Sequence, residues 1–231
     1  MCNRFFSQRE GAKRTLKRYL RPFVAPVRRY VSTPRAGNVY STHIPILIGL
    51  SRMREIKRVL EFGCGYYSTL TFLNRAAFPH LERLQSVEND GAWAHTLRDS
   101  VKGDQRWMLN LVDGEIADSV TSLDLEAFDL IMIDDSQTSA QRSLTIRAIT
   151  AMQPQRPWIV IHDFEIEEYR RAAAGFKHRH VFKAFNPETG VLSNHVTHWK
   201  SLDRTIRSNK MLDPDRTVHW IRVLSASSAA K

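Results

Sequence analysis

Short apolar runs recur along the chain, and most of them end at an acidic residue or a glycine. Five runs are predicted to form strands, over residues 58–62, 84–88, 107–112, 128–135 and 158–163. Stretches with apolar residues at helical spacing separate most of these runs, over 68–77, 93–101 and 138–152. The alternation predicts an α/β fold, a doubly wound and mostly parallel sheet whose ligands bind at the carboxyl ends of the strands.

A further helix is predicted before the first strand, over residues 40–57, with Ser41 or Thr42 as its N-cap. Its predicted buried face consists of Ile46, Leu47, Leu50 and Met53. Towards the C-terminus, residues 181–185 and 217–223 are predicted strands, and 187–190 is a predicted turn. We expect an antiparallel pair at one edge of the sheet.

The charge of the chain is concentrated near its start. The formal net charge is +10, but residues 1–36 hold ten of the 34 Lys and Arg residues and one of the 24 Asp and Glu residues. The rest of the chain is therefore close to neutral. We divide the chain into a basic N-terminal arm, residues 1–38, with apolar residues at helical spacing, and a domain at 39–231.

A glycine turn follows the first predicted strand and opens into a predicted helix. Gly63 and Gly65 are separated by one residue, and Ser68 stands where a dinucleotide-binding fingerprint has its third glycine. Glu61 precedes this turn, and Glu88 and Asp113 come at the ends of the next two predicted strands. The acids favour a nucleoside ligand, and Ser68 disfavours a nicotinamide dinucleotide.

The sequence from about residue 40 to 165 resembles the class I S-adenosylmethionine-dependent methyltransferases. The matching motifs are Val59-Leu60-Glu61-Phe62-Gly63-Cys64-Gly65, Val87-Glu88, Val112-Asp113-Gly114 and Phe128-Asp129-Leu130-Ile131-Met132-Ile133-Asp134. Gly65-Tyr66-Tyr67-Ser68-Thr69-Leu70 and His162-Asp163 are most similar to the small-molecule O-methyltransferase-like branch. A Rossmann-like methyltransferase fold follows from this resemblance.

The resemblance also implies a role for each motif in binding S-adenosyl-L-methionine. Gly63 and Gly65 would let the backbone approach the methionine portion, Glu88 would accept from the ribose hydroxyls, and Asp113 with Gly114 would face the adenine. Asp134 would face the cationic sulfonium end. The predicted cofactor-binding residues are Glu61, Gly63, Gly65, Ser68, Glu88, Asp113, Gly114 and Asp134.

The predicted catalytic residues are Asp134, His162 and Asp163, because methyl transfer to a hydroxyl needs a group that takes its proton. In the metal-dependent relatives an acid and an Asp-Asn pair bind Mg²⁺. Asp134 and Asp163 match two of these positions, but Phe164 replaces the asparagine, and Asp135 or Glu165 would have to substitute. Arg142 and Tyr169 are further candidates for the acceptor pocket.

The predicted function is therefore methyl transfer from S-adenosylmethionine to a small-molecule hydroxyl, with an Asp/His base or an Asp-bound metal. Two alternatives stay open: a nucleic-acid methyltransferase that uses the basic arm, and a non-catalytic cofactor-fold binding module. Nucleic acid is disfavoured, because Asp134-Asp135-Ser136-Gln137 stands where amino-methylating enzymes carry an Asn/Asp-Pro-Pro-aromatic run.

The remaining expectations concern the setting of the protein. Cys2 and Cys64 provide no disulfide framework, and no apolar run is long enough to span a bilayer, so we expect a cytoplasmic protein. An arginine-rich beginning also suits a mitochondrial transit peptide. Contact of the arm with a membrane surface, and an oligomeric state, are left open by the sequence.

Overall fold

The computed structural model describes residues 39–101, 103–136, 138–195 and 198–208. The predicted arm and the predicted strand at 217–223 lie outside these residues. The elements are η2 (Val39–Ser41), α2 (Ile44–Met53), β1 (Arg58–Phe62), α3 (Ser68–Leu73), β2 (Arg83–Glu88), α4 (Gly91–Val101), β3 (Trp107–Leu111), α5 (Ile116–Ser119), η3 (Val120–Ser122), η4 (Leu125–Ala127), β4 (Leu130–Ile133), α6 (Ser139–Met152), β5 (Trp158–Ile161), α7 (Glu167–Ala172), β6 (His178–Phe182), β7 (Thr189–Ser193) and α8 (Trp199–Ser208).

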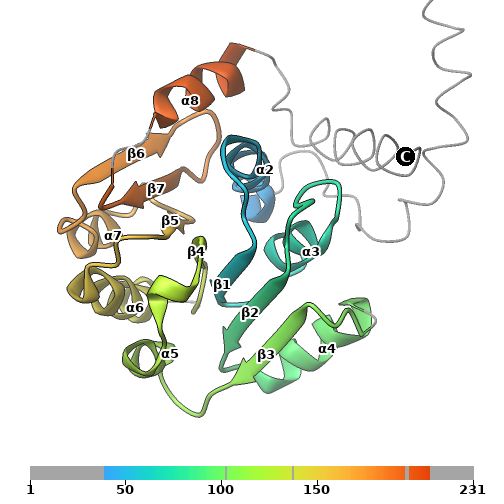
Figure 1. The fold of residues 1–231 in the computed structure, drawn as a ribbon. Helices are drawn as coiled ribbons and strands as arrows, with labels where there is room; N and C mark the ends of the chain where they lie inside the picture. The colour runs from blue at the N-terminus through green and yellow to red at the C-terminus, as the bar shows by residue number, and fades with distance from the viewer. Residues whose placement is uncertain (1–38, 102, 137, 196–197, 209–231) are drawn as a thin grey trace, which may run out of the picture.

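The sheet has seven strands in the order β3-β2-β1-β4-β5-β7-β6 (Figure 1). Strands β1 to β5 are parallel, and β7 is antiparallel to both β5 and β6. The predicted doubly wound, mostly parallel sheet with an antiparallel edge is confirmed. The strand order reverses between β1 and β4, which is where such sheets open a crevice at the carboxyl ends of their strands.

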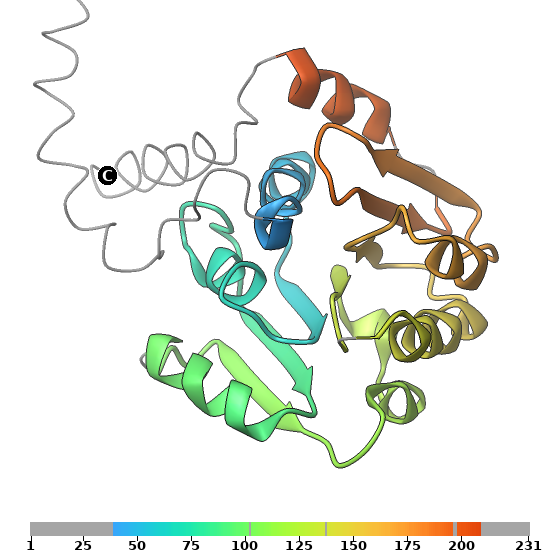
Figure 2. The ribbon, with the colours of Figure 1, turned by 180° about the vertical axis from the view of Figure 1, so that it is seen from behind.

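Helices cover both faces of the sheet (Figures 1 and 2). Leu60 and Phe62 of β1 pack with Ile146 of α6 and Tyr169 of α7 in one apolar cluster. Val59, the residue before Leu60, packs on the opposite face in a second cluster that includes residues of α2, α3 and α8. Strands β4 and β5 are buried at every position, which agrees with their almost continuous apolar sequence.

Two predicted helices are shorter than expected. Helix α2 begins at Ile44, with Pro45 in its first turn, where no backbone N–H is required. Neither Ser41 nor Thr42 caps it: His43 is at the N-cap without a side-chain cap bond, and Met53 is exposed. Helix α3 ends at Leu73, because the Asn74 carboxamide oxygen accepts from the N–H groups of two following residues.

The antiparallel edge differs from the prediction in its second strand. Thr189 and Gly190 belong to β7 and not to a turn. A Cβ at Gly190 would lie 2.5 Å from the ring of Phe164, so this glycine makes room for an aromatic side chain. Phe164 is therefore a core residue. It stands where the metal-dependent O-methyltransferases considered above have a metal-binding asparagine.

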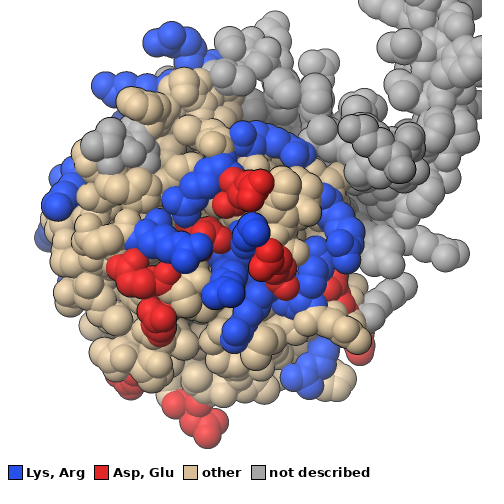
Figure 3. Space-filling model, viewed as in Figure 1, with Lys and Arg blue, Asp and Glu red and all other residues tan. Residues whose placement is uncertain are grey.

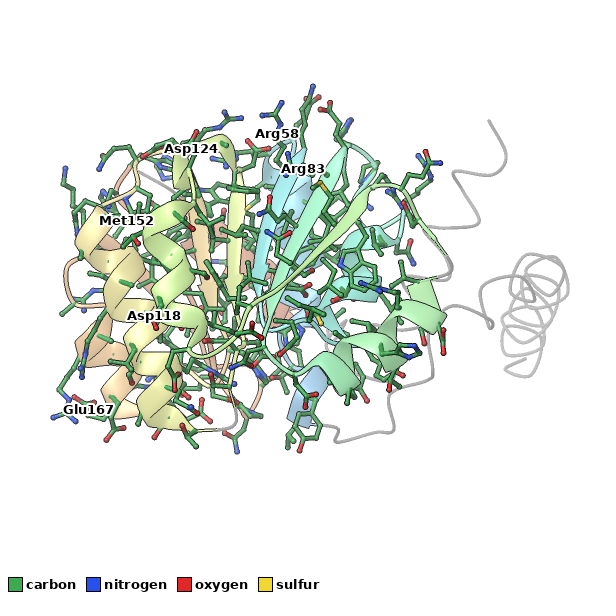
Figure 4. The ribbon with its side chains drawn as sticks, turned by 90° about the horizontal axis from the view of Figure 1, so that it is seen from below. Arg58, Arg83, Asp118, Asp124, Met152 and Glu167 are labelled. Carbon is green, nitrogen blue, oxygen red and sulfur yellow. The ribbon has the colours of Figure 1, made fainter. Side chains whose placement is uncertain are left out.

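The parallel strands begin on one side of the molecule and end on the opposite side. Figure 4 shows Arg58 and Arg83, which begin β1 and β2, on one side, and Glu167, which begins α7, on the other. The candidate site lies at the carboxyl ends of the strands, which we call the carboxyl edge. In the face seen in Figure 3, Lys and Arg lie among Asp and Glu, as expected for a domain with nearly balanced charge.

Candidate active site

The turn after β1 packs tightly on the end of β4. Gly63 has φ +80°, and a Cβ there would lie 2.5 Å from the carbonyl oxygen of Asp134. Only glycine fits that position. At Gly65 the nearest atom to a Cβ would be Ser68 Oγ at 3.6 Å, so the structure leaves the space above this residue open. The turn can therefore receive a ligand at Gly65.

Glu61 is linked to the glycine turn through side-chain hydrogen bonds. Its Oε2 accepts from Thr69 Oγ1 at 2.8 Å and from Ser86 Oγ at 2.6 Å, and Thr69 Oγ1 also accepts from the N–H of Gly65 at 3.0 Å. Burial raises the pKa of Glu61 to about 7, against the opposing effect of hydroxyl groups including that of Ser68. Glu61 and Ser68 are both buried. Glu61 thus shapes the turn and does not meet solvent.

Glu88, at the end of β2, lies directly against the same turn. Its Oε2 accepts from the N–H of Cys64 at 3.1 Å, and its Oε1 accepts from the N–H groups of Asn89 and Asp90 at 2.8 and 2.9 Å. These bonds fix the carboxylate: Oε1 accepts from two N–H groups, and Oε2 accepts from one N–H group and lies 3.6 Å from the Cys64 thiol. We call Glu61, Thr69, Ser86 and Glu88 the β1–β2 cluster.

Asp113 and Gly114 follow β3 on the far side of Glu88. Asn89 Nδ2 donates to the Gly114 carbonyl at 2.9 Å, and the N–H of Val112 donates to the Glu88 carbonyl at 3.0 Å. The loops after β2 and β3 are therefore joined. Asp113 is exposed. The structure brings the predicted ribose and adenine residues to one place on the carboxyl edge.

A dense group of charges lies where β4 and β5 end. Arg142, from α6, contacts Asp134 Oδ1 at 3.0 Å and Asp163 Oδ2 at 2.9 Å. His162 Nδ1 lies 3.3 Å from Asp134 Oδ1 and 3.5 Å from Asp163 Oδ1. Asp134 and Asp163 therefore meet on one arginine, and His162 contacts both carboxylates.

The charges in this group set each other's protonation. Burial disfavours the charged form of Asp134, but the positive charges of His162 and Arg142 outweigh it and hold its pKa at about 2. Burial likewise opposes protonation of His162, yet Asp134 and Asp163 raise its pKa above the ordinary value. Asp163 has φ 56°, a left-handed backbone that aspartate tolerates better than most residues.

Two residues that the sequence did not single out as site residues complete the group. Thr42 Oγ1 lies 2.9 Å from His162 Nε2, and the ring of His43 packs edge-on against that of His162, with centroids 4.8 Å apart. Burial, with His162 alongside, lowers the pKa of His43 to about 3. No local motif marks His43, because about 90 to 120 residues separate it from its neighbours in the site. We call His43, Asp134, Arg142, His162 and Asp163 the β4–β5 cluster.

The residues at this site do not fit the three-oxygen magnesium centre that the resemblance suggests. Asp134 and Asp163 are both paired with Arg142. Asp135 is buried and accepts from Thr145 Oγ1 at 2.6 Å, and burial raises its pKa to about 6. Glu165 Oε2 accepts from the N–H of Glu188 at 2.8 Å. The Asp135 side chain is held by Thr145 inside the protein, with Oδ1 buried and unpartnered among the described residues, and Glu165 is held by Glu188.

Comparisons with known proteins give distant structural similarities. No protein-family model and no curated protein matches the chain. Solved structures that it resembles include a proposed caffeoyl-CoA O-methyltransferase from Staphylococcus aureus (TM-score 0.48, 11% identity, 64% of this chain and 81% of that one). A second is the N-methyltransferase NodS from Bradyrhizobium japonicum with S-adenosyl-L-homocysteine (TM-score 0.47, 14% identity, 76% of this chain and 95% of that one). A third is a proposed O-methyltransferase from Klebsiella pneumoniae (TM-score 0.46, 22% identity, 76% of this chain and 90% of that one). Similarities this low say nothing about the reaction or the acceptor of this chain.

In the part of the chain that the structure describes, no helix combines the length and apolar character needed to cross a membrane.

Proposed function

We propose that this protein transfers a methyl group from S-adenosylmethionine to a hydroxyl group of a small molecule. The observation that carries the proposal is the contact between the glycine turn and Glu88. The N–H of Cys64 donates to Glu88 Oε2, so the carboxylate that would bind the ribose lies beside the open backbone of Gly65. A nucleoside with a polar, positively charged tail fits that arrangement.

Each part of the carboxyl edge has a role in this proposal. Glu88 accepts from the two ribose hydroxyls, and the joined loops after β2 and β3 present Asp113 and Gly114 to the adenine. The packing of Gly63 on the end of β4 places Asp134 next to the turn, on the side where the cationic end of the cofactor would lie. When bound, S-adenosylmethionine supplies a methyl group on a positively charged sulfur.

The β4–β5 cluster would handle the acceptor and its proton. The acceptor oxygen forms a bond to the methyl carbon while the carbon–sulfur bond breaks, and the hydroxyl proton passes to Nε2 of His162, the ring nitrogen that faces Thr42 Oγ1 and not the two carboxylates. Asp134 orients the His162 ring and stabilises its protonated form, and Asp163 supports the same charge. Arg142 keeps the two carboxylates in place. Since α7 places the buried Tyr169 ring 5.4 Å from the Arg142 guanidinium, both residues stay candidates for the acceptor pocket.

The proposal is tested by following S-adenosylhomocysteine released from S-adenosylmethionine in the presence of phenols, sugars and hydroxy acids. We expect turnover with at least one hydroxyl compound, and a large loss of turnover in Asp163→Asn with cofactor affinity retained. A matched control is Asp118→Asn, which alters an exposed carboxylate on α5. Unchanged turnover in Asp163→Asn would remove Asp163 from the mechanism. Turnover only with amines or nucleic acid would contradict the choice of acceptor.

A further inference from the structure

His43 is the polar side chain in the site that the proposed reaction leaves unused. It is 1% exposed, and neither ring nitrogen has a hydrogen-bond partner among the described residues. A buried polar atom without a partner is costly, so native structures rarely leave two of them on one ring. The described residues do not supply the partner of the His43 ring, and a bound ligand would.

The neighbours of His43 have the chemistry and spacing of a metal site. One ligand atom each from His43, Asp134 and His162 can be chosen so that all three lie within 4.8 Å of one another. Asp134 Oδ1 and His162 Nδ1 are already 3.3 Å apart. Tetrahedral bonds of about 2.0–2.1 Å separate two ligand atoms by about 3.3 Å, so this pair needs no rearrangement. The His43 nitrogen lies within 4.8 Å of both atoms and would have to move closer to complete the set.

The surroundings of these residues have the outer contacts that metal sites require. If His162 binds through Nδ1, its Nε2–H is free to donate to Thr42 Oγ1, which lies 2.9 Å away. Such a bond fixes the ring and its tautomer. Arg142 contacts Asp134 Oδ1 at 3.0 Å and would stay beside it when a metal binds, whereas a magnesium site would need both of the carboxylates that Arg142 holds. A metal binds the neutral form of His162, and with that ring neutral two carboxylates face one guanidinium, which leaves one negative charge that favours a cation.

We propose that His43, Asp134 and His162 bind one divalent transition-metal ion that favours imidazole ligands, such as Zn²⁺. Two nitrogens and one carboxylate oxygen are a ligand set that suits Zn²⁺ and not Mg²⁺, and three protein ligands leave a position for a further ligand. The ligand set shares Asp134 with the predicted Asp134–Asp163 pair and replaces Asp163 with two histidines. The metal would replace the hydrogen bond between His162 and Asp134, so with the metal bound Asp163 and not His162 would take the acceptor proton. The proposal concerns binding and holds whether or not methyl transfer is the reaction.

The test is direct titration of the full-length metal-free protein with ZnCl₂ and, separately, with CoCl₂, whose visible absorption reports a nitrogen- and oxygen-ligated tetrahedral site. We expect one ion per chain, a rise in melting temperature on adding Zn²⁺, and no comparable effect of MgCl₂. His43→Phe should lower the affinity for Zn²⁺ by more than about 100-fold, since even a lost outer contact costs about 10–100-fold. His95→Phe, at an exposed position of α4, should leave the affinity unchanged.

His43→Phe keeps a ring in the same space and removes the two unpartnered nitrogens, so the metal-free variant should melt no lower than the wild type. Thr42→Val should lower Zn²⁺ affinity by about tenfold through the outer contact alone. The absence of a cobalt spectrum in the wild type would overturn the proposal without reference to any variant. Zn²⁺ binding that persists in His43→Phe would also overturn it, because the ion would then lie elsewhere in the chain.

Discussion

The β1–β2 cluster and the β4–β5 cluster lie side by side at the carboxyl edge of the sheet, but they hold their carboxylates differently. In the β1–β2 cluster, hydroxyl and backbone N–H groups donate to Glu61 and Glu88, with no cation among the contacts. In the β4–β5 cluster, Asp134 and Asp163 are held by Arg142 and His162. The β1–β2 cluster is held by neutral hydrogen-bond donors, and the β4–β5 cluster consists of charged groups that can exchange protons.

This difference matches the two tasks of a methyl-transfer enzyme. A cofactor that is already activated by its own positive charge needs to be aligned, and the neutral donors of the β1–β2 cluster fix the turn that would align it. An acceptor hydroxyl has to lose a proton, and the coupled charges of the β4–β5 cluster suit that step. The predictions below separate the two clusters by what each loses when one residue is changed.

The largest effect is expected at Arg142, which joins the two carboxylates of the β4–β5 cluster. Arg142→Met should destabilise the protein by about 3–5 kcal/mol at neutral pH, because the partly buried Asp134 and Asp163 would lose the guanidinium that they share and keep only His162 as a partner. Chemical denaturation measures the change. Arg171→Met, which breaks an exposed ion pair of 3.5 Å with Glu168, should cost less than about 1 kcal/mol. Equal costs for the two variants would mean that Arg142 is not the support of this cluster.

The two glycines of the turn should respond in opposite ways. Gly63→Ala should destabilise the fold by about 3–4 kcal/mol, because the backbone has φ +80° and the new Cβ would collide with the end of β4. Gly65→Ala should leave the melting temperature nearly unchanged and weaken S-adenosylmethionine binding. Thermal melts and cofactor titrations of both variants distinguish these roles. A Gly65→Ala variant that binds the cofactor normally would show that the ligand does not approach the backbone there.

Glu61 should make the stability of the β1–β2 cluster depend on pH. Its pKa of about 7 in the fold lies above the ordinary value of 4.5 that it has in the unfolded chain. A raised folded pKa gives stability that is present below the unfolded pKa and is lost as pH rises through the folded pKa. Glu61→Gln carries no such charge, so its stability relative to the wild type should improve by about 2–3 kcal/mol between pH 4.5 and pH 8. Denaturation curves that show a constant difference over this range would contradict the assignment.

A smaller change is expected in the β4–β5 cluster when Asp163 loses its charge. Asp163→Asn removes one of the two carboxylates that favour protonated His162, so the pKa of His162 should fall relative to the wild type. NMR titration of the histidine ring protons follows this pKa directly and needs no acceptor. A pKa that stays the same or rises would show that Asp134 alone controls the protonation of His162.

The smallest effect is expected from the basic arm. Deleting residues 1–36 should leave the affinity for S-adenosylmethionine nearly unchanged, because none of the predicted cofactor residues lies there. Calorimetric titration of the shortened chain checks this. A large loss of affinity would mean that the arm takes part in cofactor binding.

The same comparison explains how far the sequence predicts the molecule. The β1–β2 cluster derives from residues 61–88, and its glycines and strand-end acids follow from local pattern and spacing. The five parallel strands were predicted within a few residues because buried strands have nearly continuous apolar sequences. The helices and the antiparallel edge were less accurate: Asn74 ends α3 early, and Gly190 is a packing glycine within β7.

The β4–β5 cluster was predicted only in part. Asp134, His162 and Asp163 follow strand ends, so the pattern of the sheet identifies them. His43 and Thr42 precede α2 and reach the site only because that helix packs on the sheet. The pairing of both carboxylates with Arg142 is likewise set by the position of α6, which no spacing in the sequence encodes. Contacts across about 100 residues depend on packing, and a single sequence does not specify them.

The most direct test of the central claim is calorimetric titration of the full-length protein with S-adenosylmethionine, S-adenosylhomocysteine and NAD. We predict micromolar binding of the first two compounds and none of NAD. Glu88→Ala should abolish this binding, whereas Glu82→Ala, an exposed glutamate at the opposite end of β2, should leave it intact. Absence of binding, preference for NAD, or equal binding by both variants would contradict the assignment of the β1–β2 cluster as the cofactor site.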